Sequence, residues 1–142
     1  MERVELAHEY HKNGYNCCQS VLAAFSDITG LSEQASMNIG GGAGTGELCG
    51  ALSGAIMTLG LMTPVDENDP VGSKKRTVAL SRELQKRFSA QFGALRCQDL
   101  LRNKSGASDA TSAAQRLGLT GHCDVMVVTA VEIVEELLAE RG

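Results

Sequence analysis

Four cysteines, each at the expected start of a helix, are the residues of this 142-residue chain with the clearest capacity for chemistry. They are Cys17, Cys49, Cys97 and Cys123, and a fifth, Cys18, adjoins the first. A helix N-terminus presents unpaired N–H groups and a partial positive charge, so it favours a thiolate over a thiol. Because thiolates bind metals and attack disulfides, the four cysteines predict a single assembled site.

The helix termini alone cannot hold four thiolates together. One terminus contributes about 0.3–1 kcal/mol, whereas a shift of one pKa unit requires about 1.4 kcal/mol and an ordinary thiol titrates near ~8.5. Burial raises a thiol pKa, and neighbouring thiolates repel one another. The cysteines therefore need a cation between them or oxidation in pairs. An iron–sulfur or other four-thiolate metal centre meets this need, and so do two disulfides.

The spacing of the cysteines excludes several familiar sites. The chain has no Cys-x-x-Cys motif, which excludes the usual zinc-ribbon, ferredoxin, thioredoxin and c-type haem patterns. Cys18 lies about 100° around a helix from Cys17, so the two cannot easily face one centre. A further alternative is that the cysteines are small buried residues of an ordinary core.

Three histidines lie near these cysteines in the sequence. His8 and His11 are three residues apart on the first expected helix, a spacing that favours a solvated face over a metal-binding pair. His122 precedes the fourth cysteine, where a loop residue is favoured and a base for the thiol is the alternative.

Helical periodicity predicts the elements that position the cysteines. Asn16 is expected to cap the helix of the first cysteine, with Gln19 completing a capping box. Five long helices are expected at residues 2–12, 17–28, 48–62, 74–92 and 123–141, with short helices near 32–39, 97–102 and 109–117. No segment shows sustained period-2 alternation. We therefore expect an all-α fold: a compact single-domain bundle of about five to seven helices over residues 1–142, with a glycine-rich loop.

The glycine-rich loop, residues 40–46, comes shortly before Cys49. A phosphate cradle is disfavoured, because Glu47 stands where a nucleotide-binding loop needs lysine. Glycine lets a backbone pass close to whatever it contacts. Gly44, Gly46 and Gly50 are accordingly predicted to contact the centre that Cys49 holds, with tight helix packing as the alternative.

The composition excludes some partners. A net charge of −4 and a pI near 5.3 argue against binding to nucleic acid or an anionic membrane surface. The longest apolar run, residues 48–62, is shorter than the ~20 residues that span a bilayer. The acidic start predicts no signal peptide, and hence a cytoplasmic protein, where clustered cysteines are more often metal-binding or catalytic than structural disulfides.

The sequence around the cysteines resembles a known family. The resemblance rests on four features: residues 14–21 around Cys17, the stretch Gly46-Glu47-Leu48-Cys49-Gly50-Ala51-Leu52-Ser53-Gly54-Ala55 after the glycines 40–42, Cys97 after Phe92-Gly93, and Cys123 before the last helix. Together they resemble the C_GCAxxG_C_C family of small redox-active proteins, over roughly residues 5 to 138. The resemblance assigns the four family cysteines to Cys17, Cys49, Cys97 and Cys123, leaves Cys18 as an extra, and implies a redox role.

These observations lead to a functional prediction with two alternatives. We expect an electron-transfer protein that binds an iron–sulfur or other metal-thiolate centre through the four cysteines and serves an unidentified redox partner protein. The first alternative is a thiol–disulfide protein that uses the same cysteines in two pairs, for which three pairings exist. The second is a non-redox helical interaction module. Helix faces of small residues would permit a homodimer.

Overall fold

The computed structural model describes residues 1–36, 39, 47–102 and 112–141, and this part of the chain is built from helices. The predicted all-α fold is confirmed, with 74% of the described residues helical. The only extended pairing among them is an isolated antiparallel bridge between Leu48 and Arg96. The described helices are α1 (Arg3–Lys12), α2 (Cys17–Ala24), α3 (Ser26–Thr29), α4 (Glu33–Ser36), α5 (Gly50–Leu61), α6 (Pro70–Phe92), α7 (Cys97–Arg102), α8 (Ser112–Arg116) and α9 (His122–Glu140).

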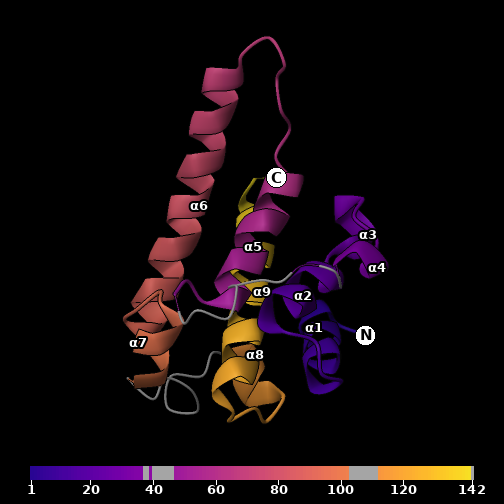
Figure 1. The fold of residues 1–142 in the computed structure, drawn as a ribbon, viewed down its shortest axis with the longest axis vertical. Coiled ribbons are helices and arrows are strands. Elements are labelled where there is room, and N and C mark those ends of the chain that lie inside the picture. The colour runs from indigo at the N-terminus through magenta and orange to yellow at the C-terminus, as the bar shows by residue number, and fades with distance from the viewer. Residues whose placement is uncertain (37–38, 40–46, 103–111, 142) are drawn as a thin grey trace.

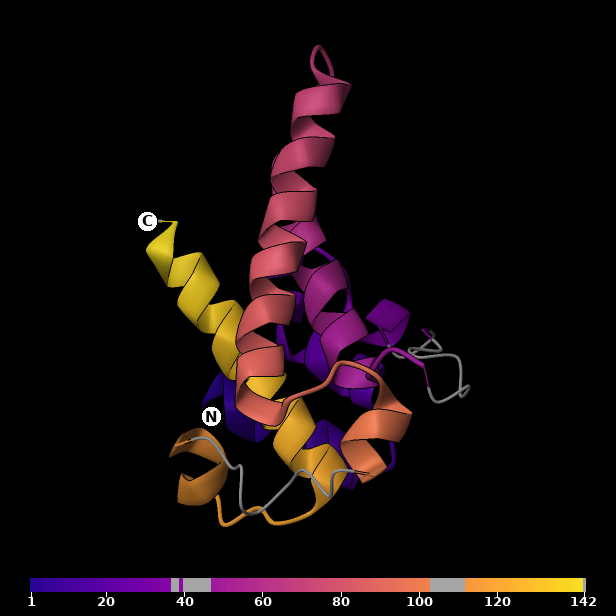
Figure 2. The same cartoon turned by 90° about the vertical axis from the view of Figure 1, so that its left-hand side faces the viewer.

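Helix α9 is the centre of the packing. Its residues from Val125 to Val131 are all buried, and α1, α2, α5, α6 and α8 pack against it. Figures 1 and 2 show α5 and α9 starting near the same end of the molecule, where α6 ends and α7 follows, while the start of α6 projects beyond the other helices. The helix starts that carry cysteines are thus gathered at one end. No helix in the described part of the chain is both long and apolar enough to cross a membrane.

Two helix starts show how local sequence sets the boundaries. The predicted capping box is confirmed: Asn16 Oδ1 accepts a hydrogen bond from the Gln19 N–H, and Gln19 Oε1 accepts one from the Asn16 N–H, both at 2.8 Å. The predicted start of the long helix at residue 74 is wrong. Helix α6 begins at Pro70, because Asp69 caps it by accepting a 3.0 Å bond from the Gly72 N–H and proline suits the first helical position.

A glycine sets the distance between α2 and α5. A Cβ atom on Gly54 would lie 2.8 Å from the carbonyl oxygen of Cys18 and 3.1 Å from Cβ of Val21. Any side chain there would push the helices apart, so glycine at this position allows α2 and α5 to pack closely. The contact fixes α5, and the cysteine before it, relative to α2.

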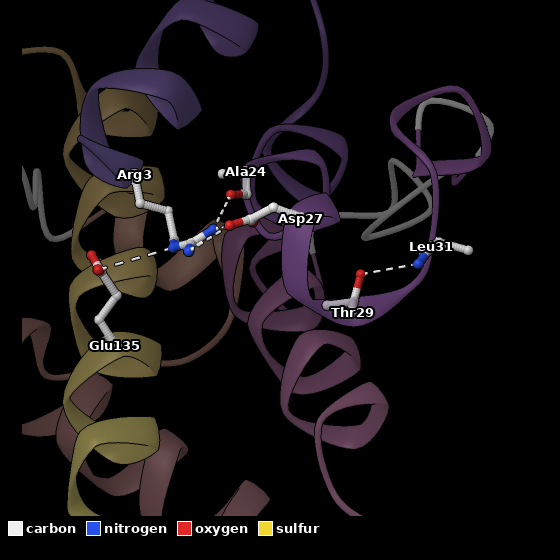
Figure 3. A network of polar contacts seen from close by, with 6 residues as sticks. All are labelled: Arg3, Ala24, Asp27, Thr29, Leu31 and Glu135. Carbon is white, nitrogen blue, oxygen red and sulfur yellow. Dashed lines mark hydrogen bonds and ion pairs between the residues drawn. The ribbon is translucent and has the colours of Figure 1, made fainter. Parts of the chain in front are cut away.

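The contact between α1 and α9, here called the α1–α9 seam, is closed at one end by Arg3 (Figure 3). The Arg3 guanidinium donates to the Ala24 carbonyl and to the Asp27 carboxylate, each at 2.6 Å, and lies 4.0 Å from the Glu135 carboxylate. It also lies 4.6 Å from the centre of the Phe25 ring. One cation thereby joins α1, α9 and the region where α2 passes into α3.

Candidate functional site

The four predicted cysteines all lie at helix starts. Cys17 and Cys97 are the first residues of α2 and α7, Cys123 is the second residue of α9, and Cys49 immediately precedes α5. Cys49 is buried and the other three are half-buried. None of the cysteines is in a disulfide, so the structure describes the thiol state. We call these four residues the cysteine group.

Cys17 and Cys123 are the members of the cysteine group that influence each other's pKa through a hydrogen bond. Their thiols hydrogen-bond to each other, and this bond is the largest influence on both pKa values. It raises the pKa of Cys17, and burial and the charges of Cys123, Cys49 and Cys97 raise it further. The same bond lowers the pKa of Cys123 to about 6, against burial, with help from the charges of nearby histidines. These opposite shifts make Cys123 the partner that ionises more readily.

Cys49 and Cys97 are held by the Leu48–Arg96 bridge. The Cys49 N–H donates to the Leu95 carbonyl at 2.9 Å, and the Cys97 N–H donates to the Glu47 carbonyl. Burial raises the pKa of Cys49 to about 11, although backbone N–H groups at the start of α5 act in the opposite direction. Burial also raises the pKa of Cys97, as does the charge of Cys123. At both residues the effect of burial on the pKa is larger than that of the helix N-terminus, so the thiol form is favoured.

Cys18 lies apart from the cysteine group despite adjoining Cys17. It is completely buried between α2 and α5. Burial raises its pKa, and its hydrogen bond with Ser53 partly offsets that effect. No member of the cysteine group is among the influences on its pKa.

His11 is a site residue that the sequence analysis missed. Its Nε2 lies 3.7 Å from Sγ of Cys17, and its Nδ1 lies 2.6 Å from Oδ1 of Asp124. The prediction that His8 and His11 are solvated is wrong, since only 23% and 20% of their side chains are exposed. Gly14, in the left-handed region at φ 104°, turns the chain from α1 into α2 and so brings the last turn of α1 against Cys17.

The other two histidines are placed differently. His8 Nδ1 lies 3.7 Å from Oδ1 of Asp124, too far for a hydrogen bond, and has no hydrogen-bond partner of its own. His122, expected in a loop, is the first residue of α9, and its charge lowers the pKa of Cys123. The sequence shows that His122, Cys123 and Asp124 are neighbours. It contains no local pattern that would place them next to the histidines of α1.

Residue types that bind metals are present at the site, but the described residues do not form a metal-ion site. Thiolates have the right donor chemistry for iron or zinc. However, no three His, Cys, Asp or Glu side chains within residues 1–36, 39, 47–102 and 112–141 are placed to hold one. Gly50 is the first residue of α5, next to Cys49, whereas Gly44 and Gly46 lie outside the described residues.

The comparison with protein families agrees with the cysteine pattern. A family model described as "Putative redox-active protein (C_GCAxxG_C_C)" matches residues 15–137, which include the whole cysteine group. The chain belongs to the C_GCAxxG_C_C family. No curated protein and no solved structure matches it. Membership of the C_GCAxxG_C_C family supports a redox role. The match begins after α1, so His11 lies outside it while Asp124 lies within it.

Proposed function

We propose that this C_GCAxxG_C_C protein is a thiol–disulfide redox protein in which Cys123 is the attacking thiolate and Cys17 is the resolving thiol. The observation that carries the proposal is the hydrogen bond between the two thiols, with their opposite pKa shifts. A thiolate is the nucleophile in disulfide exchange, and near neutral pH Cys123 is ionised while its partner keeps its proton. Of the three possible pairings, this hydrogen bond favours the one that joins Cys17 to Cys123.

The reaction takes a disulfide, RSSR, as its oxidant. The Cys123 thiolate attacks one sulfur, forms a Cys123–S–S–R mixed disulfide and releases RS⁻, which takes a proton from water. Cys17 then loses its proton and attacks Sγ of Cys123. The Cys17–Cys123 disulfide forms, the bond to R breaks, and a second RS⁻ leaves and is protonated. Two electrons pass from the two cysteines to the substrate, which leaves as two thiols.

Cys49 and Cys97 are proposed to remain thiols. They are diagonal neighbours across the Leu48–Arg96 bridge. Diagonal residues of an antiparallel pair lie about 7–8 Å apart, whereas disulfide-bonded Cα atoms are typically about 4.4–6.8 Å apart. Both are proposed to stay protonated near neutral pH, because burial raises the pKa of each.

The test is oxidation of the reduced protein by glutathione disulfide, followed by peptide mapping of the products. We expect a Cys17–Cys123 disulfide and two equivalents of glutathione per protein. Cys17→Ser should trap the mixed disulfide on Cys123, whereas the matched neighbour Cys18→Ser should behave as wild type. A bond that joins Cys17 to Cys49 or Cys97 would contradict the assignment.

Absorption spectra and assays of iron, sulfide and thiols on protein purified without oxygen distinguish the proposed function from the two other functions predicted from the sequence. Visible absorption with stoichiometric iron and acid-labile sulfide would contradict the proposal and favour the iron–sulfur centre predicted from the sequence. Thiols that are indifferent to both disulfide and metal would favour the interaction module. A colourless protein that consumes glutathione disulfide supports the thiol–disulfide function.

A further inference from the structure

We propose that His11 is the base that deprotonates Cys17 in the resolving step, and that Asp124 is a positioning residue that holds His11 in the required tautomer. The inference rests on the proposed thiol–disulfide function, and it assigns roles to two residues outside the cysteine pattern. It is carried by a continuous chain of contacts, from Asp124 Oδ1 through the His11 ring to Sγ of Cys17.

The contact with Asp124 sets which nitrogen of His11 is free to accept a proton. An ionised carboxylate only accepts hydrogen bonds, so at 2.6 Å the His11 Nδ1 must carry the hydrogen. In a neutral imidazole the other nitrogen is then an acceptor. That nitrogen, Nε2, is the one that lies 3.7 Å from Cys17 Sγ, a distance consistent with an S–H donor.

The S–H proton of Cys17 can be accepted by Cys123 or by His11, and the acceptor depends on the state of Cys123. In the dithiol state the Cys123 thiolate accepts it, which stabilises the attacking group. Once Cys123 has formed a mixed disulfide, its negative charge is gone and it is a poor acceptor. Nε2 of His11, 3.7 Å from Cys17 Sγ, is then an acceptor within reach of the Cys17 S–H. The attack by Cys123 therefore redirects the hydrogen bond of the Cys17 S–H to His11, which can then accept the proton in the resolving step.

Cys17 needs a base because its surroundings oppose its ionisation. Burial raises its pKa, and any charge on Cys49 before α5 or Cys97 on α7 would raise it further; both effects persist after Cys123 on α9 has lost its charge in the mixed disulfide. The group that faces it from α1 is His11. In the resolving step the proton moves to Nε2, the Cys17 sulfur bonds to Sγ of Cys123, and the bond to R breaks. The departing RS⁻ takes the proton from Nε2, so His11 ends the cycle neutral.

The test follows both steps of the reaction with glutathione disulfide in rapidly mixed, acid-quenched samples. Peptide mapping of each sample measures the mixed disulfide on Cys123 and the Cys17–Cys123 disulfide. His11→Asn should slow the resolving step about 100-fold, the scale of general-base catalysis, and the mixed disulfide should accumulate. The residual rate should rise with pH, because Cys17 must then lose its proton to the solvent. His8→Asn, one turn earlier on α1, should resolve at the wild-type rate.

Asp124→Asn distinguishes positioning from a general disturbance. The charge of Asp124 raises the pKa of Cys123, so its loss should leave the first step as fast or faster. The resolving step should slow, because an amide can also donate to Nδ1 and stabilise the wrong tautomer. A structural defect would slow both steps together and would overturn the role of Asp124.

Added imidazole provides a readout that does not depend on the fold of one variant. His11→Ala opens space beside Cys17, and imidazole should restore its resolving step. Resolution at the wild-type rate in His11→Asn, or an equal defect in His8→Asn, would overturn the relay while leaving the dithiol function intact. A wild-type protein that forms no Cys17–Cys123 disulfide would instead overturn the proposed function itself.

Discussion

The two ends of the α1–α9 seam have the same construction and different chemistry. At one end Arg3 reaches from α1 towards Glu135 of α9, and at the other His11 reaches from α1 to Asp124 of α9. Both α1 side chains are 20% exposed, and each also contacts α2 or the turn that follows it. Position and burial therefore do not distinguish the two ends.

The difference lies in what the Arg3 and His11 side chains can do with a proton. A guanidinium stays charged at any ordinary pH and only donates hydrogen bonds. Arg3 accordingly acts as a fixed clamp on a carbonyl, a carboxylate and an aromatic ring. An imidazole can both give and take a proton, and His11 lies against a thiol that must lose one in the proposed reaction. The seam thus has a structural end at Arg3 and, in the proposed reaction, a reactive end at His11.

The largest effect we expect is selective alkylation at the reactive end. With pKa values of about 6 for Cys123 and about 11 for Cys49, the thiolate fractions near neutral pH differ by roughly 10⁴-fold. The lower intrinsic nucleophilicity of the less basic thiolate reduces this by roughly 10²-fold. Iodoacetamide should therefore modify Cys123 roughly 100-fold faster than Cys49, as measured by peptide mapping. Equal rates would remove the basis for treating Cys123 as the attacking residue.

The next prediction concerns the structural end. Arg3→Met keeps an apolar stem near Phe25 but leaves the Ala24 carbonyl without its donor. We expect the free energy of unfolding to fall by about 1–2 kcal/mol, measured by urea denaturation. The rate of Cys17–Cys123 disulfide formation should not change.

Arg87→Met is the matched control for Arg3→Met. Arg87 pairs with Glu83, Glu136 and Glu140, whose side chains are all at least 41% exposed, so its loss should cost less than about 1 kcal/mol. If Arg3→Met slowed disulfide formation as much as His11→Asn, the two ends would not be separate in function.

The sequence was sufficient for the features that depend on local chemistry. The capping box of Asn16 and Gln19 follows from hydrogen bonding within four residues, and the apolar face of α9 follows from helical spacing. The start of α6 was missed because its cap, Asp69, stands in a loop-like run of polar residues and prolines. That error is local, and the rule for proline at a helix start corrects it.

The contact between His11 and Asp124 could not be predicted in this way. His11 and Asp124 are 113 positions apart, and only the packing of α1 on α9 brings them together. In the sequence, all four cysteines at helix starts are equally favoured as thiolates, because each lies at a helix N-terminus. The separation of their pKa values depends on burial and on which two thiols share a hydrogen bond. Both are properties of the packed molecule.

The reactive end should make stability depend on pH between about 6 and 9. Because the pKa of Cys123 is lowered, its contribution is present above the ordinary thiol pKa and is lost as the pH falls towards 6. Because the pKa of Cys17 is raised, its contribution is present below the ordinary value and is lost as the pH rises above it. The reduced protein should therefore become more stable as the pH rises from about 6 to about 9, the ordinary thiol value, and less stable above it. In thermal melts under reducing conditions, Cys17→Ala should flatten this dependence and Cys18→Ala should retain it.

The smallest effect is expected at Asp27, and it falls in a different range of pH. The hydrogen bond and charge of Arg3 lower the pKa of Asp27, so its contribution is present above the ordinary value near ~3.9 and is lost as the pH falls below that value. Its side chain is 63% exposed, and an asparagine could still accept from Arg3, so Asp27→Asn should cost about 0.5 kcal/mol near neutral pH. Urea denaturation is the suitable measurement, because guanidinium chloride would screen the pair. The cost should be constant from pH 6 to 9, where Cys17→Ala changes the pH profile, and should shrink in acid. A cost that varied between pH 6 and 9 would mean that the two ends of the seam are electrostatically coupled, and that Arg3 is part of the reactive end after all.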